Sequence, residues 1–464
     1  MRLELSFDWR LVLFFLAFYG LLFAGAPGVN LVMLLLILNA LRSVEGSLQS
    51  LFLLSLVLIG NGKLIYKYSL MIVLGRWVVL ILASLNIFFR TRSFAPLTLW
   101  FLALMAVVMG NSIAFGQLPG VSVFKALVFT LGVFGLLTGF RCADNLEGFG
   151  NFLFNGFLVV VGLSALVGVL APGISWLVSE HTDFSGLTGV VNHPQPFAVY
   201  LSMTLVLVLG NLFDNERVYR LAIPLFAALL GLVLMYLTKA RVAFVVVGSV
   251  VGLSTLLAFF KHSYASRYRF IFSHAFPYLV GGALMLTLYL NPRGIQEQIT
   301  DFVYKNGRNG YDLVESFQGS RGFLILQQVA NIERHPLTGI GFGVPSRLEG
   351  LEIGKDPLFG IPIQAQVEKG TIFLAIIEEN GFLIGGLVFG FIITLVVLGA
   401  RSTKLMIFGT ILAGILVNLG EAIFFSLGGS GLYAWLLMTF CLGLAAREEG
   451  GAAAGAGLGT IRPT

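Results

Sequence analysis

Polar residues that could do chemistry gather at four places along this otherwise apolar chain. At each place a cation, a histidine or a carboxylate lies beside a long apolar segment: 192–194, 238–241, 320–343 and 368–381. Arginine binds phosphate oxygens through two parallel hydrogen bonds and stays protonated, and a partly buried carboxylate can act as a general base. These residue types could bind a phosphorylated ligand and accept a proton, provided that the apolar segments bring them together.

The apolar segments predict an all-α fold, a polytopic bundle of transmembrane helices. The chain is 57% hydrophobic and 11% charged, with a mean hydropathy of +0.91, whereas soluble domains are about half apolar and about a quarter charged. A spanning helix needs about 20 apolar residues, and these runs are continuous instead of alternating as in a barrel. Because the first three runs are short, we expect 12 to 14 spans among segments 9–25, 27–40, 47–60, 67–89, 95–110, 121–140, 149–170, 194–212, 219–237, 241–260, 275–290, 370–398, 404–419 and 431–446.

Lysine and arginine in the short connections predict how the bundle is oriented. Cations concentrate at 90–92, 261–269 and 401–404, which share one side of the membrane if the spans alternate. The positive-inside rule makes that side the cytoplasm and places both termini there. This topology explains the net charge of +6, so we expect contact with membrane lipids and no role in nucleic-acid binding.

One connection is much longer than the others. Residues 291–369 form a 79-residue segment on the predicted outer face, with 8 Lys or Arg and 9 Asp or Glu. Within it, apolar residues at helical spacing predict a helix that Pro336 ends: Phe323, Leu326, Val329 and Ile332. The spacing therefore predicts a folded cap with helical segments.

Two further features limit the possible chemistry. The glycines and alanines of 450–459 have little to bury, so we expect a disordered cytoplasmic tail over 447–464. The chain has two cysteines, Cys142 and Cys441, and neither takes part in a Cys or His pattern with metal-ligand spacing. We therefore expect neither a metal site nor another cofactor.

Taken in order, the four polar places resemble the O-antigen ligase and O-antigen polymerase superfamily of bacterial envelope glycosyltransferases. The resemblance covers residues 186–386 and has four parts: a His-Pro pair that opens a span (His193), an arginine at the next outer turn (Arg241), an arginine-led helix that ends in Pro-x-x-Gly-x-Gly (Arg321), and a Glu-x-Gly in the span after the large loop (Glu379). It divides the chain into N-terminal transmembrane helices (1–185), a ligase/polymerase-like region (186–446) with its outer loop at 291–369, and the tail (447–464).

The resemblance implies transfer of a glycan from undecaprenyl diphosphate to a hydroxyl group of a glycan, lipid or protein. The reaction would take place at the periplasmic or extracellular face of a bacterial inner (plasma) membrane, without metal or nucleotide sugar. Arg241 and Arg321 match the two diphosphate-binding arginines of the family, and Lys239 could add a further positive charge. Without the resemblance, Arg241 and Lys239 would be interpreted as snorkelling anchors at a helix end.

The general base is where the chain departs from the family. Members carry a histidine near the end of the large loop, but residues 364–371 contain none. Glu368 is the nearest replacement, and pairing with Lys369 as a surface charge is the equal alternative.

Other ionisable residues lie inside predicted spans. At least one of Glu378 and Glu379 is expected to face the protein interior, where pairing with an arginine is as reasonable as catalysis. We expect Arg76 to pack within the bundle, and His193 to make a hydrogen bond at the start of its helix or, with Glu379, to line a cleft.

Two other classes of function fit the same hydropathy. A secondary transporter or a translocator of lipid-linked glycans would also keep charges within the membrane. A noncatalytic relative that acts as an assembly scaffold would explain the missing histidine.

Overall fold

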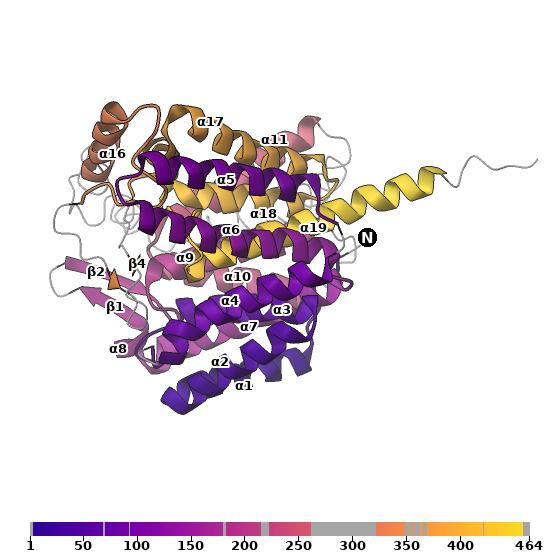
Figure 1. Ribbon diagram of the computed structural model, residues 1–464. Coiled ribbons are helices and arrows are strands. Elements are labelled where there is room, and N and C mark those ends of the chain that lie inside the picture. Colours follow the sequence, from indigo (N-terminus) through magenta and orange to yellow (C-terminus); the bar gives the residue numbers. More distant parts are fainter. Residues whose placement is uncertain are drawn as a thin grey trace, which may run out of the picture.

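The computed structural model describes residues 3–67, 70–91, 93–179, 182–214, 222–260, 322–348, 354–355, 362–364, 369–420 and 422–457. They form a bundle of roughly aligned helices with short strands at one end (Figure 1). Eight of the described helices are long and apolar enough to cross a bilayer: α2 (Gly25–Arg42), α4 (Leu70–Arg90), α5 (Pro96–Phe115), α6 (Pro119–Cys142), α7 (Leu146–Leu170), α9 (Pro194–Asp214), α17 (Ile372–Arg401) and α19 (Gly429–Gly457). Four apolar helices are shorter: α1 (Trp9–Phe23), α3 (Val44–Ile59), α10 (Ala222–Leu237) and α18 (Leu405–Leu416). A further helix, α11 (Arg241–Phe260), is apolar over Arg241–Ser254.

These helices confirm the all-α prediction and the membrane class. Each of them coincides with one of the apolar segments predicted from the sequence, and the remaining segment, 275–290, lies outside the described residues. The periphery is apolar as well, because α2 exposes Leu31, Leu34, Leu35 and Leu38. Soluble proteins rarely expose apolar patches of more than a few hundred Å², so a lipid surround is the environment that these side chains fit.

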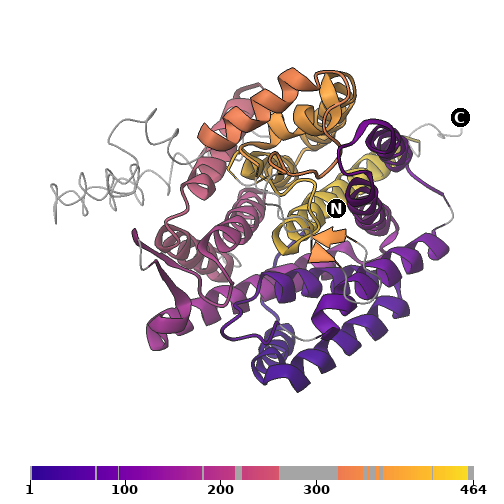
Figure 2. The same cartoon turned by 60° about the vertical axis from the view of Figure 1, so that its left-hand side comes forward.

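Of the eight long helices, α9 and α19 are the most buried. They lie inside the bundle, where α19 is yellow in Figure 2, and α3, α6 and α18 pack around them. The rings of Tyr200 and Tyr433 lie 4.6 Å apart between the two central helices, and the Tyr433 hydroxyl makes a hydrogen bond with Thr204. Small residues allow close helix contact, since a Cβ atom at Gly210 would lie 2.5 Å from the Cα of Met406. Such close approach is typical of helix packing in membranes.

The connections predicted to be outer meet at one end of the bundle, which we call the loop end. Its described residues are 60–67, 116–118, 171–179, 182–193, 238–240, 335–348, 420 and 422–428. It carries the hairpin β1 (Trp176–Ser179) and β2 (Thr182–Leu187), the short helices α8 (Pro172–Ser175) and α16 (Phe323–Arg334), and strands β3 (Gly354–Lys355) and β4 (Pro362–Gln364) (Figure 1). The connections bind each other directly. The Asn61 N–H donates to Val190 O at 2.8 Å, and the Gln117 N–H donates to Ile340 O at 2.8 Å.

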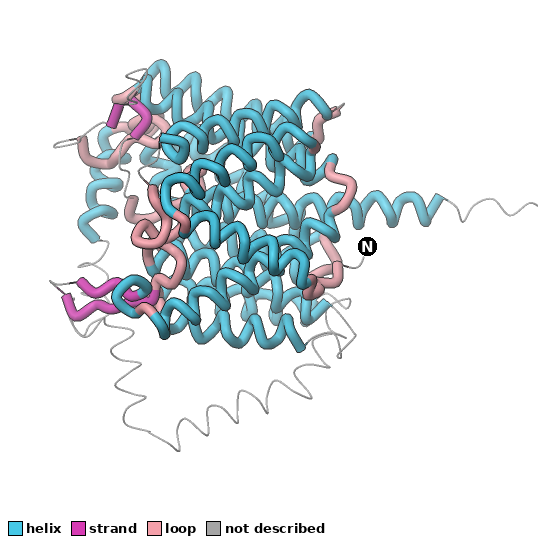
Figure 3. Tube along the Cα trace, turned by 90° about the horizontal axis from the view of Figure 1, so that it is seen from below, coloured by secondary structure: helices cyan, strands magenta, loops and turns pink. Residues whose placement is uncertain are grey.

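The connections predicted to be cytoplasmic meet at the opposite end. There Arg90 donates to Arg42 O at 3.1 Å, and the Asp144 N–H donates to Glu45 at 2.8 Å. Figure 3 shows the helices running between the two ends. The described helices therefore follow the alternating path on which the orientation was predicted. The side of the membrane that each end faces stays a prediction.

Two segments bear on the predicted cap and tail. Helix α16 lies within the segment 320–334 predicted to be helical and ends at Arg334, two residues before Pro336. Helix α19 runs to Gly457, so the backbone is helical through 447–457, where we expected disorder; the alanines there are strong helix formers. Residues 291–321 and 458–464 lie outside the described part, and the division at residue 185 stays a prediction.

Candidate functional site

Helix α17 is interrupted where the sequence places Glu378, Glu379, Asn380 and Gly381, and the segment 335–343 fills the interruption. Gly381 leaves helical geometry with φ 70°. The Ile340 N–H donates to Glu378 O at 2.8 Å, and the Phe382 N–H donates to Pro336 O at 2.8 Å. The structure thus brings two of the four polar places, the Pro-x-x-Gly-x-Gly motif and the Glu-x-Gly motif, into direct contact.

Glycine makes this contact possible. Gly339, Gly341 and Gly343 have φ of 68°, 106° and 65°, a backbone region that side chains disfavour. A Cβ atom at Gly339 would lie 2.4 Å from the carbonyl carbon of Glu379. These glycines therefore have a structural role at the contact between the two motifs.

A buried ionic cluster forms beside the interruption. Lys369 Nζ lies 2.6 Å from Glu378 Oε2 and 3.6 Å from Glu379 Oε1. Glu378 also accepts hydrogen bonds from Asn331 of α16 at 2.7 Å and from Ser346 at 3.1 Å. Lys369 and Glu379 are each 3% exposed and Glu378 is 0% exposed, so Lys369 is not a surface charge. This lysine therefore pairs with both carboxylates, whereas an arginine was the expected structural partner. Lys369 lies two residues before Thr371, the N-cap of α17.

Gly343 joins this cluster to helix α6. Its N–H donates to Glu379 Oε2 at 2.8 Å, and its carbonyl accepts a hydrogen bond from Lys125 Nζ at 2.6 Å. Lys125 was not among the predicted site residues. It is the one lysine within the predicted span 121–140, and a charge within a span is costly to keep, so that signal was available.

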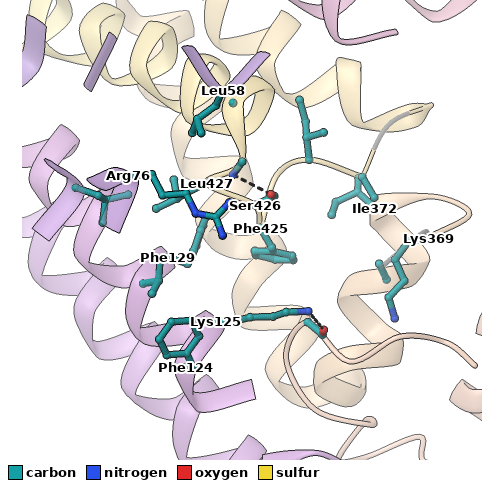
Figure 4. Close-up of a pocket in the computed structure, with 18 of the residues that line it drawn as sticks. Leu58, Arg76, Phe124, Lys125, Phe129, Lys369, Ile372, Phe425, Ser426 and Leu427 are labelled. Carbon is teal, nitrogen blue, oxygen red and sulfur yellow. Dashed lines mark hydrogen bonds between the residues drawn. The ribbon is translucent and has the colours of Figure 1, made fainter. Parts of the chain in front are cut away.

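Lys125, Lys369 and Glu379 line a cavity of about 580 Å³ near the loop end, between α4, α6 and α17. Figure 4 shows Arg76, Lys125 and Lys369 entering it from three different elements. The other walls are largely apolar. They combine the aromatic residues Trp77, Phe124, Phe129 and Phe425 with aliphatic residues such as Leu58, Leu80 and Leu427. The volume lies within the range of about 300–1,000 Å³ that is usual for ligand sites.

Arg76 has a different position from the one expected, because it lines this cavity instead of only packing in the bundle. Its guanidinium lies 4.8 Å from the centre of the Trp77 ring, which is within the distance of a cation–π interaction. Arg76 Nε is buried and has no hydrogen-bond partner among the described residues.

Arg241 and Lys239 lie at the turn between α10 and α11, also at the loop end. Arg241 is the first residue of α11 and is half-buried, whereas Lys239 is exposed and has φ 54°. Neither lines the cavity. The neighbouring Val242 packs against Gly420, and the connection that starts there supplies cavity-lining residues from Ala422 onward. This connection therefore lies between the Arg241 turn and the cavity.

His193 precedes α9, and its Nδ1 accepts a hydrogen bond from the Gln195 N–H at 3.3 Å. Burial lowers the pKa of His193, so the side chain is neutral at pH 7. The hydrogen-bonded helix start predicted for this residue is confirmed. His193 does not line the cavity, although Gln195 does.

Two predicted site residues, Glu368 and Arg321, lie outside the described residues, so their roles stay predictions. Their chain neighbours are described: Lys369 lines the cavity, and Gly322 is the N-cap of α16. Over the described ranges, no group of three or more His, Cys, Asp and Glu residues is arranged to hold a metal ion.

Comparison with known proteins does not assign this chain to a family. No protein-family model matches the chain, and no curated protein matches it either. The geometry of the loop end therefore carries the functional argument.

Proposed function

We propose that this chain is a membrane glycosyltransferase that moves a glycan from a polyprenyl diphosphate, of the undecaprenyl type, to a hydroxyl acceptor at the outer face of a bacterial plasma membrane. The observation that carries the proposal is the contact between the Pro-x-x-Gly-x-Gly and Glu-x-Gly motifs, which builds a charged cavity at the loop end. Gly339 of the first motif and Glu379 of the second are 40 residues apart in the sequence, and they meet in one site. This meeting supports the proposal that the two motifs act together.

In this proposal the diphosphate is held by Arg241 and Arg321, with Lys239 as an additional positive charge. The diphosphate is the leaving group, and arginine stabilises the charge that develops on it as the glycosidic bond breaks. The acceptor hydroxyl loses its proton to Glu368, which precedes the cavity residue Lys369. The half-burial of Arg241 at a helix start supports its part, because a charge there is partly screened from water.

The second candidate is a transporter or a translocator of lipid-linked glycans. One specific observation favours it: α17 is interrupted at Gly381 next to buried charges, and interrupted helices often form the binding sites of transporters. Purified protein in liposomes would then move the lipid-linked glycan or a solute and form no covalent product. Production of a glycosylated acceptor by the purified protein decides for the transferase.

The arginine assignment predicts loss of transfer in cells. Arg241→Ala and Arg321→Ala are each expected to lower the transferred glycan about 10- to 150-fold, because a hydrogen bond to a charged group contributes roughly 1.5–3 kcal/mol. The measurement is the profile of carrier-linked and transferred glycan, with expression matched by immunoblot. Arg334→Ala is the control, since Arg334 is an exposed cation at the end of α16. Unchanged transfer in both variants would exclude the assignment.

The proposed base gives a separate prediction. Glu368→Gln keeps the size of the side chain but removes the proton acceptor, so carrier-linked glycan should accumulate as it does in Arg321→Ala. If Glu368→Gln transfers glycan normally while the arginine variants do not, the base is another residue.

The proposed orientation can be tested with the cysteines. Cys142 is exposed at the end opposite to the loop end, and Cys441 is buried. In cells with an intact plasma membrane, a membrane-impermeant maleimide should label Lys63→Cys, which introduces a thiol at an exposed loop-end position, and should leave Cys142 unlabelled. Cys142 should react only after the plasma membrane is permeabilised, and the reverse pattern would invert the topology.

A further inference from the structure

Arg76 is a charged residue inside α4 that the diphosphate site at Arg241 does not use. It is the seventh residue of a helix that begins at Leu70, so it lies about 9 Å along the axis from the helix start. Charges at this depth are rare and usually serve a function. The cation–π contact with Trp77 holds the guanidinium at the wall of the cavity, and Arg76 Nε has no hydrogen-bond partner among the described residues.

Arg76 differs from the other two cations that line the cavity, which contact neighbouring polar groups. Three cations, Arg76, Lys125 and Lys369, line it. Two carboxylates belong to the same cluster, Glu378 and Glu379, and both contact Lys369. Lys125 donates to the Gly343 carbonyl, whereas Arg76 Nε has no hydrogen-bond partner among the described residues. Arg76 is therefore the cation with which an added anion would interact strongly at a largely apolar wall.

The aromatic residues of the cavity wall are suited to packing against the face of an uncharged ring, such as a sugar ring. Trp77, Phe124, Phe129 and Phe425 contribute aromatic side chains, and the face of an aromatic ring is electron-rich and attracts weakly positive C–H groups. A sugar ring presents such C–H groups on its faces. A sugar that also carries a carboxylate would bring the single negative charge that Arg76 can bind through a planar pair of hydrogen bonds.

We propose that this cavity binds an acidic sugar, one with a single carboxylate such as a uronic acid, and that Arg76 is the residue that pairs with the carboxylate. The inference rests on the proposed function, because it assigns the substrate class of the glycan being transferred. It is separate from the diphosphate subsite, since Arg241 does not line the cavity. Lys125 and Lys369 hold Glu379 and Gly343 in place beside the bound sugar.

The test uses the purified full-length protein in lipid nanodiscs. Binding of a sugar is measured as the change that it causes in the thermal unfolding midpoint. Sodium glucuronate is expected to raise the midpoint in a saturable way, while glucose at the same concentrations and ionic strength is not. Arg76→Gln should weaken the glucuronate effect at least about tenfold, and Arg76→Lys should retain part of it. Arg10→Gln is the matched control, because Arg10 also lies over a tryptophan ring, that of Trp9, at 5.5 Å, but on the exposed first turn of α1.

Three outcomes would overturn the inference. Glucose could stabilise as well as glucuronate does; Arg76→Gln could bind glucuronate as wild type does; or pyrophosphate could displace glucuronate from wild type while losing its own effect in Arg76→Gln, which would make the cavity a diphosphate site. Two further results separate a failure of this inference from a failure of the proposed function. If Arg241→Ala abolishes glycan transfer while Arg76→Gln binds glucuronate normally, only the acidic-sugar inference fails. If glucuronate binding depends on Arg76 but the purified protein forms no transfer product, only the transferase proposal fails.

Discussion

Replacement of Lys369 by methionine is expected to destabilise the protein by about 3–5 kcal/mol, the cost of leaving a buried charge without its partner. Lys369 is the cation that contacts both Glu378 and Glu379, which are 0% and 3% exposed. Without it, two neighbouring buried carboxylates would lose the cation that contacts both of them. The expected result is a lower unfolding midpoint and less folded protein in the membrane fraction.

A second variant separates lost charge pairing from lost packing. Lys369→Met combined with Glu378→Gln and Glu379→Gln removes the uncompensated negative charges, so stability should largely return. Lys63→Met is the control, because Lys63 is an exposed lysine at the loop end. If Lys369→Met unfolds at the wild-type temperature, the ionic cluster does not hold α17 to the loop-end segments.

Replacement of Gly381 by alanine is expected to cost about 2–6 kcal/mol, from strain of about 1–3 kcal/mol and overpacking of about 1–3 kcal/mol. Gly381 has φ 70°, and a Cβ atom there would lie 2.1 Å from Leu337 O. The obstacle is backbone, so it cannot rotate away as a side chain would. The 335–343 segment would have to leave α17, and the unfolding midpoint should fall accordingly.

Gly386→Ala is the matched control for this prediction. Gly386 lies in the same helix, and a Cβ atom there would meet nothing within 4 Å. Alanine is a better helix former than glycine, so this variant should be as stable as wild type or slightly more stable. Equal unfolding midpoints for Gly381→Ala and Gly386→Ala would show that the contact across the interruption is not needed for stability.

The sequence was sufficient to predict the helices, because a bilayer imposes their length and their apolar character. The bounds of α9 to α11 differ by at most three residues from the segments read from hydropathy. Loop-end contacts could not be predicted this way. Nothing in the spacing of Lys125 and Gly343 indicates that a lysine of α6 bonds a carbonyl 218 residues further along the chain.

The candidate site was predicted in part. The resemblance selected the two motifs that meet at Gly381, yet the partner of Glu378 and the cavity position of Arg76 needed three-dimensional packing. A lone arginine in a span is usually a packed residue, and only the position of Trp77 and the connection before α19 makes this one a wall of a cavity. Arg321 and Glu368 keep the roles that the resemblance implies, as proposals.

The interruption of α17 also bears on how the protein is assembled. In an unbroken helix the Phe382 N–H would bond to the carbonyl of Glu378, but here it bonds to Pro336 O, while Glu378 O accepts the Ile340 N–H. Lipid offers no substitute for such backbone bonds. In this interrupted conformation, the Phe382 N–H and the Glu378 carbonyl are therefore satisfied only when the segment 336–341 is in place. The segment 336–341 precedes α17 in the sequence, so it is synthesised first. Its backbone groups are therefore available for hydrogen bonding when α17 emerges.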